Sequence, residues 1–357
     1  MFLYLLYPLS KYFIIFNVFK YITFRAIGAT LTAFVLSLIL GPYFIETLKT
    51  RKVGQKIRED VPERHKGKSG TPTIGGVLIL VSILLSLFLW VDVKNVYVWT
   101  TMAILLGYGA VGLVDDIVKI TKTPQGLGGW KKIGAEAFIA LLIAIVLMMN
   151  PDFNTSLSIP FLKKITINLG WFYILFAILV IVGSSNAVNL ADGLDGLAIG
   201  PIMTCASVFM VFSYVTGHVK FSDYLLLPYI PGLGELAVFC GALIGAGLGF
   251  LWFNAYPAQM FMGDVGSLAL GGALGILALL TKQEILLVLV GGVFVWETIS
   301  VIFQVISFQW KRKRIFLMAP IHHHFELKGW EEPKITVRFW IISIILALLG
   351  LSALKLR

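Results

Sequence analysis

The stretch NAYPAQMFMGDVG (residues 254–266) is where a mostly apolar chain turns polar, and the fold can be worked out from it. Apolar runs at 233–253 and 265–281 flank it, so its single acid, Asp264, is expected where one helix leaves a membrane and the next begins. A carboxylate at that depth is unfavourable unless a cation or a substrate compensates its charge. We therefore interpret Asp264 as a functional residue. An N-cap of the following helix is the alternative.

The composition of the whole chain indicates a membrane protein. Its 357 residues are 58% hydrophobic and 13% charged, with a mean hydropathy of +0.89, whereas soluble proteins carry about 25% charged residues. Apolar runs of about 20 residues, enough to cross a bilayer, recur along it. We predict an all-α polytopic integral membrane protein, a single domain over 1–357. Its ten spans are expected at 22–45, 73–91, 95–114, 132–149, 171–190, 197–217, 233–253, 265–281, 284–309 and 334–354.

The distribution of Lys and Arg predicts the orientation. The net charge is +10, and in a polytopic protein such an excess is typical of cytoplasmic loops rather than of nucleic-acid binding. The loops at 46–72, 115–131 and 310–333 carry eight, three and five of these residues, and the opposing loops carry one or two each. The basic side is therefore predicted to be cytoplasmic. An even number of spans then places both termini outside.

Two segments outside the spans carry predictions of their own. The first twenty residues are apolar and aromatic but interrupted by Pro8, Ser10 and Lys11, and they lack the basic start and cleavage site of a signal peptide. We expect an interfacial or membrane-embedded helix there. The outer, periplasmic loop 150–170 contains alternating β-branched stretches, which predict a short β-hairpin.

Four motifs rich in acids or histidines fall in different loops, all on the basic side. A transport path would more naturally place ionisable groups near the middle of the bilayer. Only Glu136, Glu235 and Glu297 lie within spans or near their ends, and none has an evident partner. The pattern favours a catalytic pocket at the cytoplasmic membrane surface. The motif residues are Asp115, Asp116, Asp192, Asp195, Asp264 and His322–His324.

Asp115 and Asp116 close the third predicted span, so they are expected at a helix C-terminus, where the helix dipole disfavours negative charge. Lys119 could pair with either acid, and this structural pairing is the alternative to a catalytic role. Adjacent helical residues point about 100° apart, so the two acids are expected to have different roles. One would face a metal ion or a nucleophile, and the other would orient it.

The segment NLADGLDG (189–196) alternates acids with glycines at the mouth of a helix. Asx turns and helix capping account for such a pattern by themselves. In the functional interpretation, Gly193 and Gly196 let the backbone approach a flat ligand, while Asp192 and Asp195 accept hydrogen bonds from it.

The triplet His322–His323–His324 holds three of the five histidines of the chain. Three consecutive side chains cannot all point the same way, so a tridentate zinc site is not expected. We expect one or two of them near a phosphate or a metal ion. Glu297 and Gln304 lie two turns apart on one face of the ninth predicted span, where they could line the pocket or bond a neighbouring helix.

Five motifs together resemble the phospho-N-acetylmuramoyl-pentapeptide transferases (translocase I), a family within the polyprenyl-phosphate N-acetylhexosamine-1-phosphate transferase superfamily. They are TPTIGG (71–76), VDDIVK (114–119), NAVNLADGLDGLAIGP (186–201), FNAYPAQMFMGDVGSL (253–268) and APIHHHFELKGW (319–330). Their order matches that of the family, and the triple histidine favours this family over relatives that transfer N-acetylglucosamine phosphate. The departures are Ile74, Ala191 and Glu331, which stand where Met, Thr and Pro are common.

The resemblance implies a reaction. The enzyme would transfer phospho-MurNAc-pentapeptide from UDP-MurNAc-pentapeptide to undecaprenyl phosphate, with Mg²⁺, giving UMP and lipid I for peptidoglycan synthesis. It would be a multi-pass protein of the bacterial cytoplasmic (inner) membrane with its active site facing the cytoplasm. Its partners would be these two substrates and membrane lipid, with no nucleic acid, and a homodimer stays open.

The resemblance also implies roles for individual residues. Asp264 would hold Mg²⁺ with help from Asn254. Asp115 or Asp116 would deprotonate or orient the lipid phosphate, and a covalent aspartyl-phosphate route is the less favoured version. The residues expected near the pyrophosphate or sugar are His322 and His323. Lys119 and Lys132 would contact phosphate groups, and Phe261 could stack on the uracil ring. The residues expected to frame the uridine pocket are Lys68, Thr73, Asn189, Leu190, Asp192, Gly193, Asp195 and Phe261. Asn186 and Gln304 are further expected substrate-binding residues.

Two rival functions remain at this point. A sister transferase would use a different UDP-sugar, such as UDP-GlcNAc, with the same lipid acceptor. A proton- or metal-coupled transporter would use the same acids for transport, and it would release no UMP.

Overall fold

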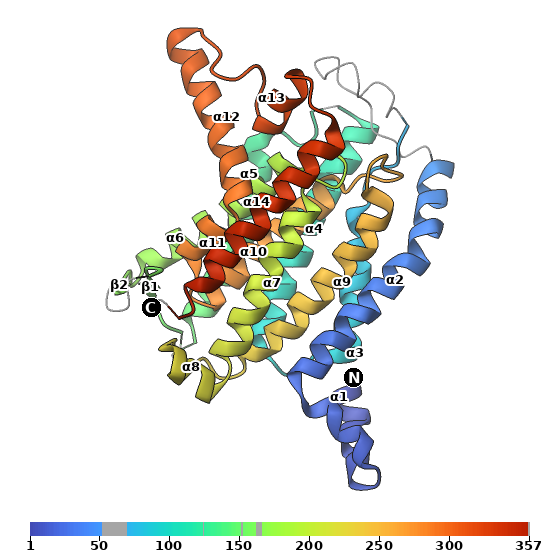
Figure 1. Cartoon of the computed structure of the whole chain (residues 1–357), viewed down its shortest axis with the longest axis vertical. Helices are drawn as coiled ribbons and strands as arrows, with labels where there is room; N and C mark the ends of the chain where they lie inside the picture. The colour runs from blue at the N-terminus through green and yellow to red at the C-terminus, as the bar shows by residue number, and fades with distance from the viewer. Residues whose placement is uncertain (52–69, 124, 151–152, 162–165, 356–357) are drawn as a thin grey trace.

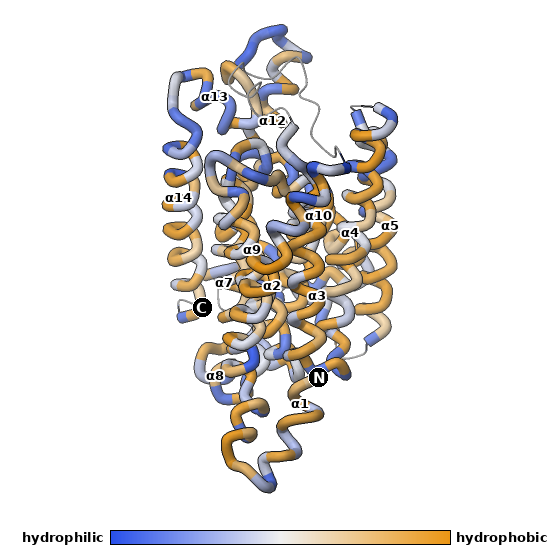
Figure 2. The backbone as a smooth tube through the Cα atoms, turned by 90° about the vertical axis from the view of Figure 1, so that its right-hand side faces the viewer, coloured by the Kyte–Doolittle hydropathy of each residue, from blue (hydrophilic) through white to orange (hydrophobic). Residues whose placement is uncertain are grey.

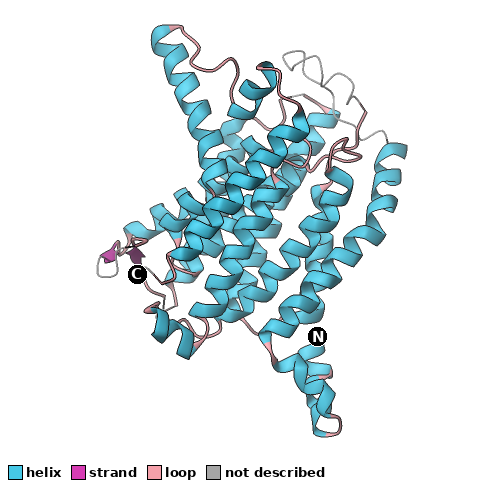
Figure 3. Ribbon diagram, in the orientation of Figure 1, coloured by secondary structure: helices cyan, strands magenta, loops and turns pink. Residues whose placement is uncertain are grey.

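The computed structural model describes residues 1–51, 70–123, 125–150, 153–161 and 166–355. Most of this is helical (Figure 3). Lys68, one of the predicted substrate-binding residues, lies outside the described residues.

Within the described ranges, eight helices are long and apolar enough to cross a membrane. They confirm a helical, polytopic membrane protein. Of the other two predicted spans, α3 (Gly76–Trp90) is an apolar helix of 15 residues, and α5 (Gly129–Met148) carries Lys131, Lys132 and Glu136 in its first two turns. The eight are α2 (Ile22–Thr50), α4 (Val96–Thr121), α6 (Phe172–Ala191), α7 (Ile199–Thr216), η4 with α9 (Leu233–Asn254), α10 (Gly263–Leu280), α12 (Gly292–Lys311) and α14 (Glu332–Ser352).

The ninth predicted span, 284–309, is divided into two helices at its pair of glycines. The chain forms α11 (Glu284–Val290), breaks at Gly291 and continues as α12. Two consecutive glycines have low helix propensity, and a Cβ at Gly292 would come within 2.8 Å of Leu346 in α14. Figure 1 shows α12 diverging from the bundle beyond this break.

The N-terminal segment is also not the single helix that we expected. It consists of α1 (Phe2–Leu5) and two 3₁₀ helices, η1 (Tyr7–Lys11) and η2 (Ile14–Lys20). Pro8 has no N–H to donate, which favours a helix start over a helix interior at this point. Phe2 and Phe19 pack on Trp90, with ring centroids 5.0 and 5.9 Å apart, so the segment is attached to the end of α3.

The loop at 150–170, for which the sequence predicts a hairpin, contains two three-residue strands. They are β1 (Ser156–Ser158) and β2 (Thr166–Asn168), which pair antiparallel with Leu157 opposite Ile167 (Figure 3). Both termini lie at this end of the molecule (Figure 1). The remaining short helices are α8 (Val219–Leu225) and α13 (Ile321–Leu327).

Glycines bring the central helices into backbone contact, and this positions the start of α10. A Cβ at Gly76 of α3 would collide with the backbone of Gly266, and one at Gly112 of α4 would collide with the backbone of Asp264. Such close approach is typical of small residues between membrane helices. The first turn of α10 is therefore enclosed by α3 and α4. Figure 2 shows hydrophobic helices through the middle of the molecule and hydrophilic backbone gathered around α13 and the nearby end of α12.

Candidate active site

Three buried carboxylates form the centre of the site. Asp115 and Asp116 come from α4, and Asp264 is the second residue of α10. Their exposed fractions are 3%, 4% and 8%, and one oxygen from each lies within 4.8 Å of the others. Two motifs that are distant in the sequence thus share one acidic cluster.

Two lysines partly neutralise the cluster. Lys119 Nζ lies 2.7 Å from Asp115 Oδ2, 2.9 Å from Asp264 Oδ1 and 4.0 Å from Asp116 Oδ1. Lys132 Nζ, from the first turn of α5, lies 2.9 Å from Asp264 Oδ2. The predicted local pairing of Lys119 with the Asp115–Asp116 pair is present, but the same ammonium group also reaches across to α10.

Asp264 does not cap its helix. The N-cap of α10 is Met262, and each Asp264 carboxylate oxygen faces an ammonium group instead. The preceding backbone is fixed by hydrogen bonds from Phe261 N to Pro72 O and from Gly76 N to Met262 O, at 2.8 and 2.7 Å. Gly263 has a φ of +73°, and a Cβ there would lie 2.5 Å from Asp116 Oδ2, so this turn favours glycine.

The two adjacent acids of α4 have different backbone partners, in line with their angular separation on the helix. Asp115 Oδ1 accepts a hydrogen bond of 2.7 Å from Leu127 N in the loop before α5. Asp116 Oδ2 accepts one of 3.2 Å from Val265 N in α10. Asp115 therefore orders the loop that leads to Lys132, and Asp116 attaches α4 to the start of α10.

The loop after α6 places a second pair of acids beside the cluster. Asp195 is 2% exposed and its Oδ2 accepts a hydrogen bond of 3.0 Å from Ala258 N. Asp192 is half-buried at the end of α6. Burial, together with the charges of Asp264, Asp116 and Asp195, raises the pKa of the Asp192 carboxyl to about 8. Its carboxyl therefore holds its proton near neutral pH unless a cation or a ligand donor approaches.

Asn254 joins this loop to the stretch that precedes Asp264. Its Oδ1 accepts a hydrogen bond of 3.0 Å from Gly196 N, and its Nδ2 donates one of 2.9 Å to Met260 O. The side chain is 4% exposed. The amide thus fixes two backbone segments of the site. A contribution at a metal ion stays a prediction.

Each histidine of the triplet has a different neighbour, as expected for consecutive side chains. His322 Nδ1 lies 3.1 Å from Glu297 Oε1, and His323 Nδ1 lies 2.6 Å from Glu326 Oε2. His324 Nδ1 accepts a hydrogen bond from Leu317 N. The triplet does not form a common metal site.

Several other predicted residues make hydrogen bonds within the protein. Asn186 donates to Glu136 Oε2 at 2.5 Å, and Asn189 donates to Ser267 Oγ at 2.8 Å. Gln304 bonds the backbone of residues 315 and 316, which folds the loop after α12 back onto that helix. Substrate contacts by these three side chains stay predictions. The remaining predicted residues are Thr73, which is 8% exposed, Gly193, which is exposed, and Leu190 and Phe261, which are half-buried.

Known proteins similar to this chain were compared with it. A family model described as glycosyl transferase family 4 matches residues 96–282. A phospho-N-acetylmuramoyl-pentapeptide-transferase of Citrifermentans bemidjiense is 58% identical over 354 residues, covering 99% of both chains. Proteins of the same name from Syntrophus aciditrophicus and Desulfotalea psychrophila are 56% and 55% identical over 355 and 359 residues, covering 99% and 100% of both chains.

The chain belongs to the phospho-N-acetylmuramoyl-pentapeptide-transferase family. The resemblance that the five sequence motifs indicated is confirmed. The residues matched by the broader family model include Asp115, Asp116, Lys132 and Asp264, so the whole acidic cluster lies within the matched range.

Sequence reasoning missed two residues that support the site in this family member. Glu332, at the start of α14, accepts a hydrogen bond of 2.7 Å from Asp195 N. Ser267 of α10 accepts the hydrogen bond from Asn189. No sequence pattern marks either residue for these hydrogen bonds. Their roles follow only from the packing of α14 and α6 against the site.

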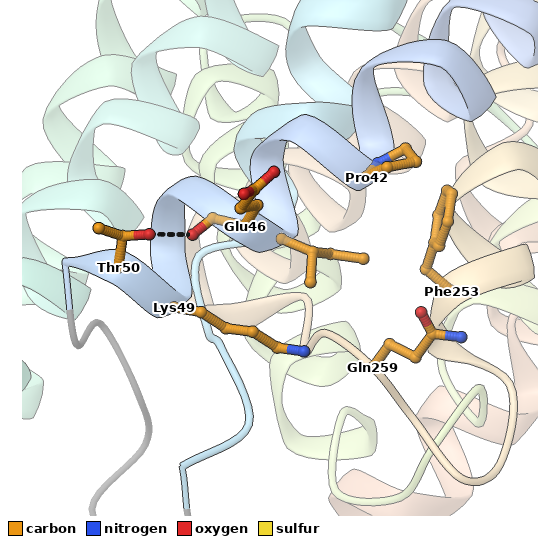
Figure 4. Close-up of a pocket in the computed structure, with 7 residues that line it drawn as sticks. Pro42, Glu46, Lys49, Thr50, Phe253 and Gln259 are labelled. Atoms are coloured by element: carbon orange, nitrogen blue, oxygen red, sulfur yellow. Dashed lines mark hydrogen bonds between the residues drawn. The ribbon is translucent and has the colours of Figure 1, made fainter.

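A separate cavity of about 340 Å³ lies beside the C-terminal half of α2 (Figure 4). It is lined on one side by α2 and on the other by Phe253 and Gln259, at the end of α9 and in the loop after it. None of the predicted site residues of this transferase lines it, so it is distinct from the acidic cluster. The residues from α2 are Pro42, Ile45, Glu46, Lys49 and Thr50.

Proposed function

We propose that this chain transfers phospho-MurNAc-pentapeptide from UDP-MurNAc-pentapeptide to undecaprenyl phosphate, giving UMP and lipid I. The proposal is supported by full-length relatives that are named phospho-N-acetylmuramoyl-pentapeptide-transferase and are 55–58% identical to this chain. The sister transferase and transporter alternatives have no comparable support. The acidic cluster with its two lysines is the part of the molecule whose chemistry suits this reaction.

The reaction brings two anionic groups together. An oxygen of the lipid phosphate attacks the β-phosphorus of the nucleotide-sugar, the bond from that phosphorus to the bridging oxygen breaks, and UMP leaves with the electron pair. Because the two phosphate groups repel each other, the site must supply cations and positioning. Lys119 and Lys132 project ammonium groups into the cluster and are the proposed phosphate contacts.

Asp264 is the proposed Mg²⁺ ligand. The donor set fits, since Mg²⁺ prefers carboxylate oxygen and three carboxylates meet within 4.8 Å. When bound, Mg²⁺ would neutralise charge on the diphosphate and on the leaving UMP. Each Asp264 oxygen lies 2.9 Å from a lysine ammonium group, so these lysines would have to shift toward the substrate phosphates as the ion binds.

Asp115 or Asp116 is proposed to accept the proton of the lipid phosphate or to orient it. Of the two, Asp116 has the partner that fits an orienting role, because Val265 N holds its carboxylate beside Asp264. The uridine is proposed to bind at the Asp192–Asp195 loop, whose Gly193 is exposed. Phe261 would stack on the uracil ring.

The proposed setting is the bacterial inner membrane, with ten spans, both termini outside and the site facing the cytoplasm. The excess of Lys and Arg in the loops beside the site supports this orientation. Labelling of single cysteines from each side of the membrane tests it. If a cysteine at position 122 were labelled only from the outer face, the orientation would be the opposite of the one proposed. Native mass spectrometry of the purified protein in detergent tests the homodimer.

The decisive experiment for function is an exchange assay between labelled UMP and the nucleotide-sugar, run in lipid with and without Mg²⁺. We expect exchange only with UDP-MurNAc-pentapeptide, undecaprenyl phosphate and Mg²⁺ together. Exchange supported by UDP-GlcNAc in place of the MurNAc donor would indicate the sister transferase. Solute flux into liposomes without UMP release would indicate a transporter.

A further inference from the structure

Glu297 is a fully buried carboxylate inside α12, and its neighbour is His322 of α13. The two side chains are 0% and 1% exposed, and His322 Nδ1 lies 3.1 Å from Glu297 Oε1. Among the described residues, neither carboxylate oxygen and neither ring nitrogen has a hydrogen-bond partner that meets normal angular criteria. A buried carboxylate is strongly unfavourable unless it is paired. His322 is therefore the group that compensates Glu297.

The packing around this pair fixes the position of the ring. Val293, one turn before Glu297, and Ile321, next to His322, belong to a buried apolar cluster that includes Leu194 and Leu197 of the loop after α6. The His322 ring also lies against the His323 ring, with centroids 4.2 Å apart, and Glu297 is the carboxylate within ion-pair distance of it among the described residues.

The opposite edge of the His322 ring touches the loop that carries Asp192 and Asp195. A Cβ added at Gly193 would collide with His322 Nε2 and would lie 2.8 Å from Cε1. The imidazole therefore stands between the Glu297 carboxylate on one side and the Gly193 backbone on the other. A change at Glu297 would reach the loop through the ring, without any direct contact.

We infer that Glu297 is a positioning residue for the nucleotide site: its carboxylate holds the His322 ring against Gly193 and so sets the backbone of the 192–195 loop. This inference rests on the proposed function, because that loop is the proposed uridine site. A carboxylate accepts hydrogen bonds and cannot donate them. It therefore selects the ring state in which Nδ1 carries the proton and directs Nε2 toward the loop. A glutamine of the same size can donate as well as accept hydrogen bonds, so it would not favour this one state of the ring.

The test uses purified full-length protein in lipid, with wild type, Glu297→Gln, Glu297→Asp and, as a matched control, Thr298→Val. Thr298 is the next residue of α12, and within the described part of the chain its hydroxyl donates a hydrogen bond to its own helix, at Phe294 O. We expect Glu297→Gln to raise the KM for UDP-MurNAc-pentapeptide about tenfold, because it leaves the buried His322 ring without its anionic partner. The KM for undecaprenyl phosphate should stay within twofold of wild type, and Glu297→Asp should restore part of the loss.

A double-mutant cycle with His322→Gln separates positioning from general packing. If Glu297 acts through His322, the double variant has the nucleotide KM of His322→Gln alone, because the second change removes an interaction that is already lost. Additive losses, or equal effects on the KM of both substrates, would overturn the inference. Should Glu297→Gln not accumulate in membranes, the Glu297→Asp variant runs the same cycle, and an unchanged nucleotide KM there would likewise overturn it. Absence of UMP release by wild type would contradict the proposed function instead.

Discussion

Lys132 and Asp264, 132 positions apart, form an ion pair with Nζ 2.9 Å from Oδ2 inside the bundle. The lysine comes from the first turn of α5 and the acid from the first turn of α10. Together with Lys119 the pair links three helices around one carboxylate. This relationship gives the acidic cluster its cationic side and underlies the first two predictions.

Asp264→Asn is expected to lower UMP release at least about a hundredfold while the protein still accumulates in membranes. An amide keeps the size of the side chain but cannot neutralise two ammonium groups or serve as a strong Mg²⁺ ligand. Exchange activity at increasing Mg²⁺, beside thermal unfolding of the purified variant, is the measurement. Near-normal turnover would leave Asp264 with a structural role only.

Lys132→Met should reduce kcat/KM by roughly ten- to hundredfold, since a hydrogen bond to a charged group contributes about 1.5–3 kcal/mol. Lys131→Met is the matched control, because Lys131 is the preceding residue of α5 and is exposed. Steady-state kinetics with both substrates is the measurement. Equal losses in the two variants would indicate a general effect of charge on α5.

Asp192→Asn should change how stability depends on pH. Burial and nearby acids raise the pKa of this carboxyl from 3.8 to about 8 in the folded protein. The folded state therefore holds a proton that the unfolded state has released, and stability falls as pH rises between these values. We expect the variant to match wild type near pH 4 and to unfold at a higher temperature than wild type at pH 8.5. The same difference at both pH values would argue against the raised pKa.

Asp192→Ala tests the role of the same carboxyl in binding. It is expected to weaken binding of the nucleotide substrate more than it slows the chemical step. Steady-state kinetics separates the two effects. A large loss of kcat at an unchanged KM would contradict the assignment of Asp192 to the uridine site.

Gly76→Ala should destabilise the protein by about 1–3 kcal/mol, the usual effect of overpacking. Its Cβ would collide with the backbone of Gly266, and backbone cannot move aside as a side chain can. Gly134→Ala in α5 is the control, since a Cβ there meets nothing within 4 Å. Thermal unfolding in detergent compares the two. A Gly76→Ala protein as stable as the control would mean that α3 and α10 are less closely packed than described.

The family could be predicted from sequence because it depends on short-range patterns. Apolar runs of the length of a bilayer, motifs in a fixed order and the spacing of acids are all visible in the chain. The eight helices that are long and apolar enough to cross a membrane, and the family, follow from these features. The packing at the glycine pair of the ninth predicted span could not be predicted in the same way, because an apolar run does not reveal that Gly292 lies against Leu346 of α14.

The amino-acid sequence by itself determined a helical membrane protein of this transferase family, with acids near the ends of its helices. Only the tertiary structure decided which side chains meet. In the folded chain Lys132 forms an ion pair with Asp264, and the buried Glu297 lies beside His322. The side chains of Gln304 and Asn254 form hydrogen bonds with backbone groups. The physical reason is that such pairs depend on how closely helices approach. That approach is set by glycines such as Gly76 and Gly112, whose contacts lie more than a hundred residues away along the chain.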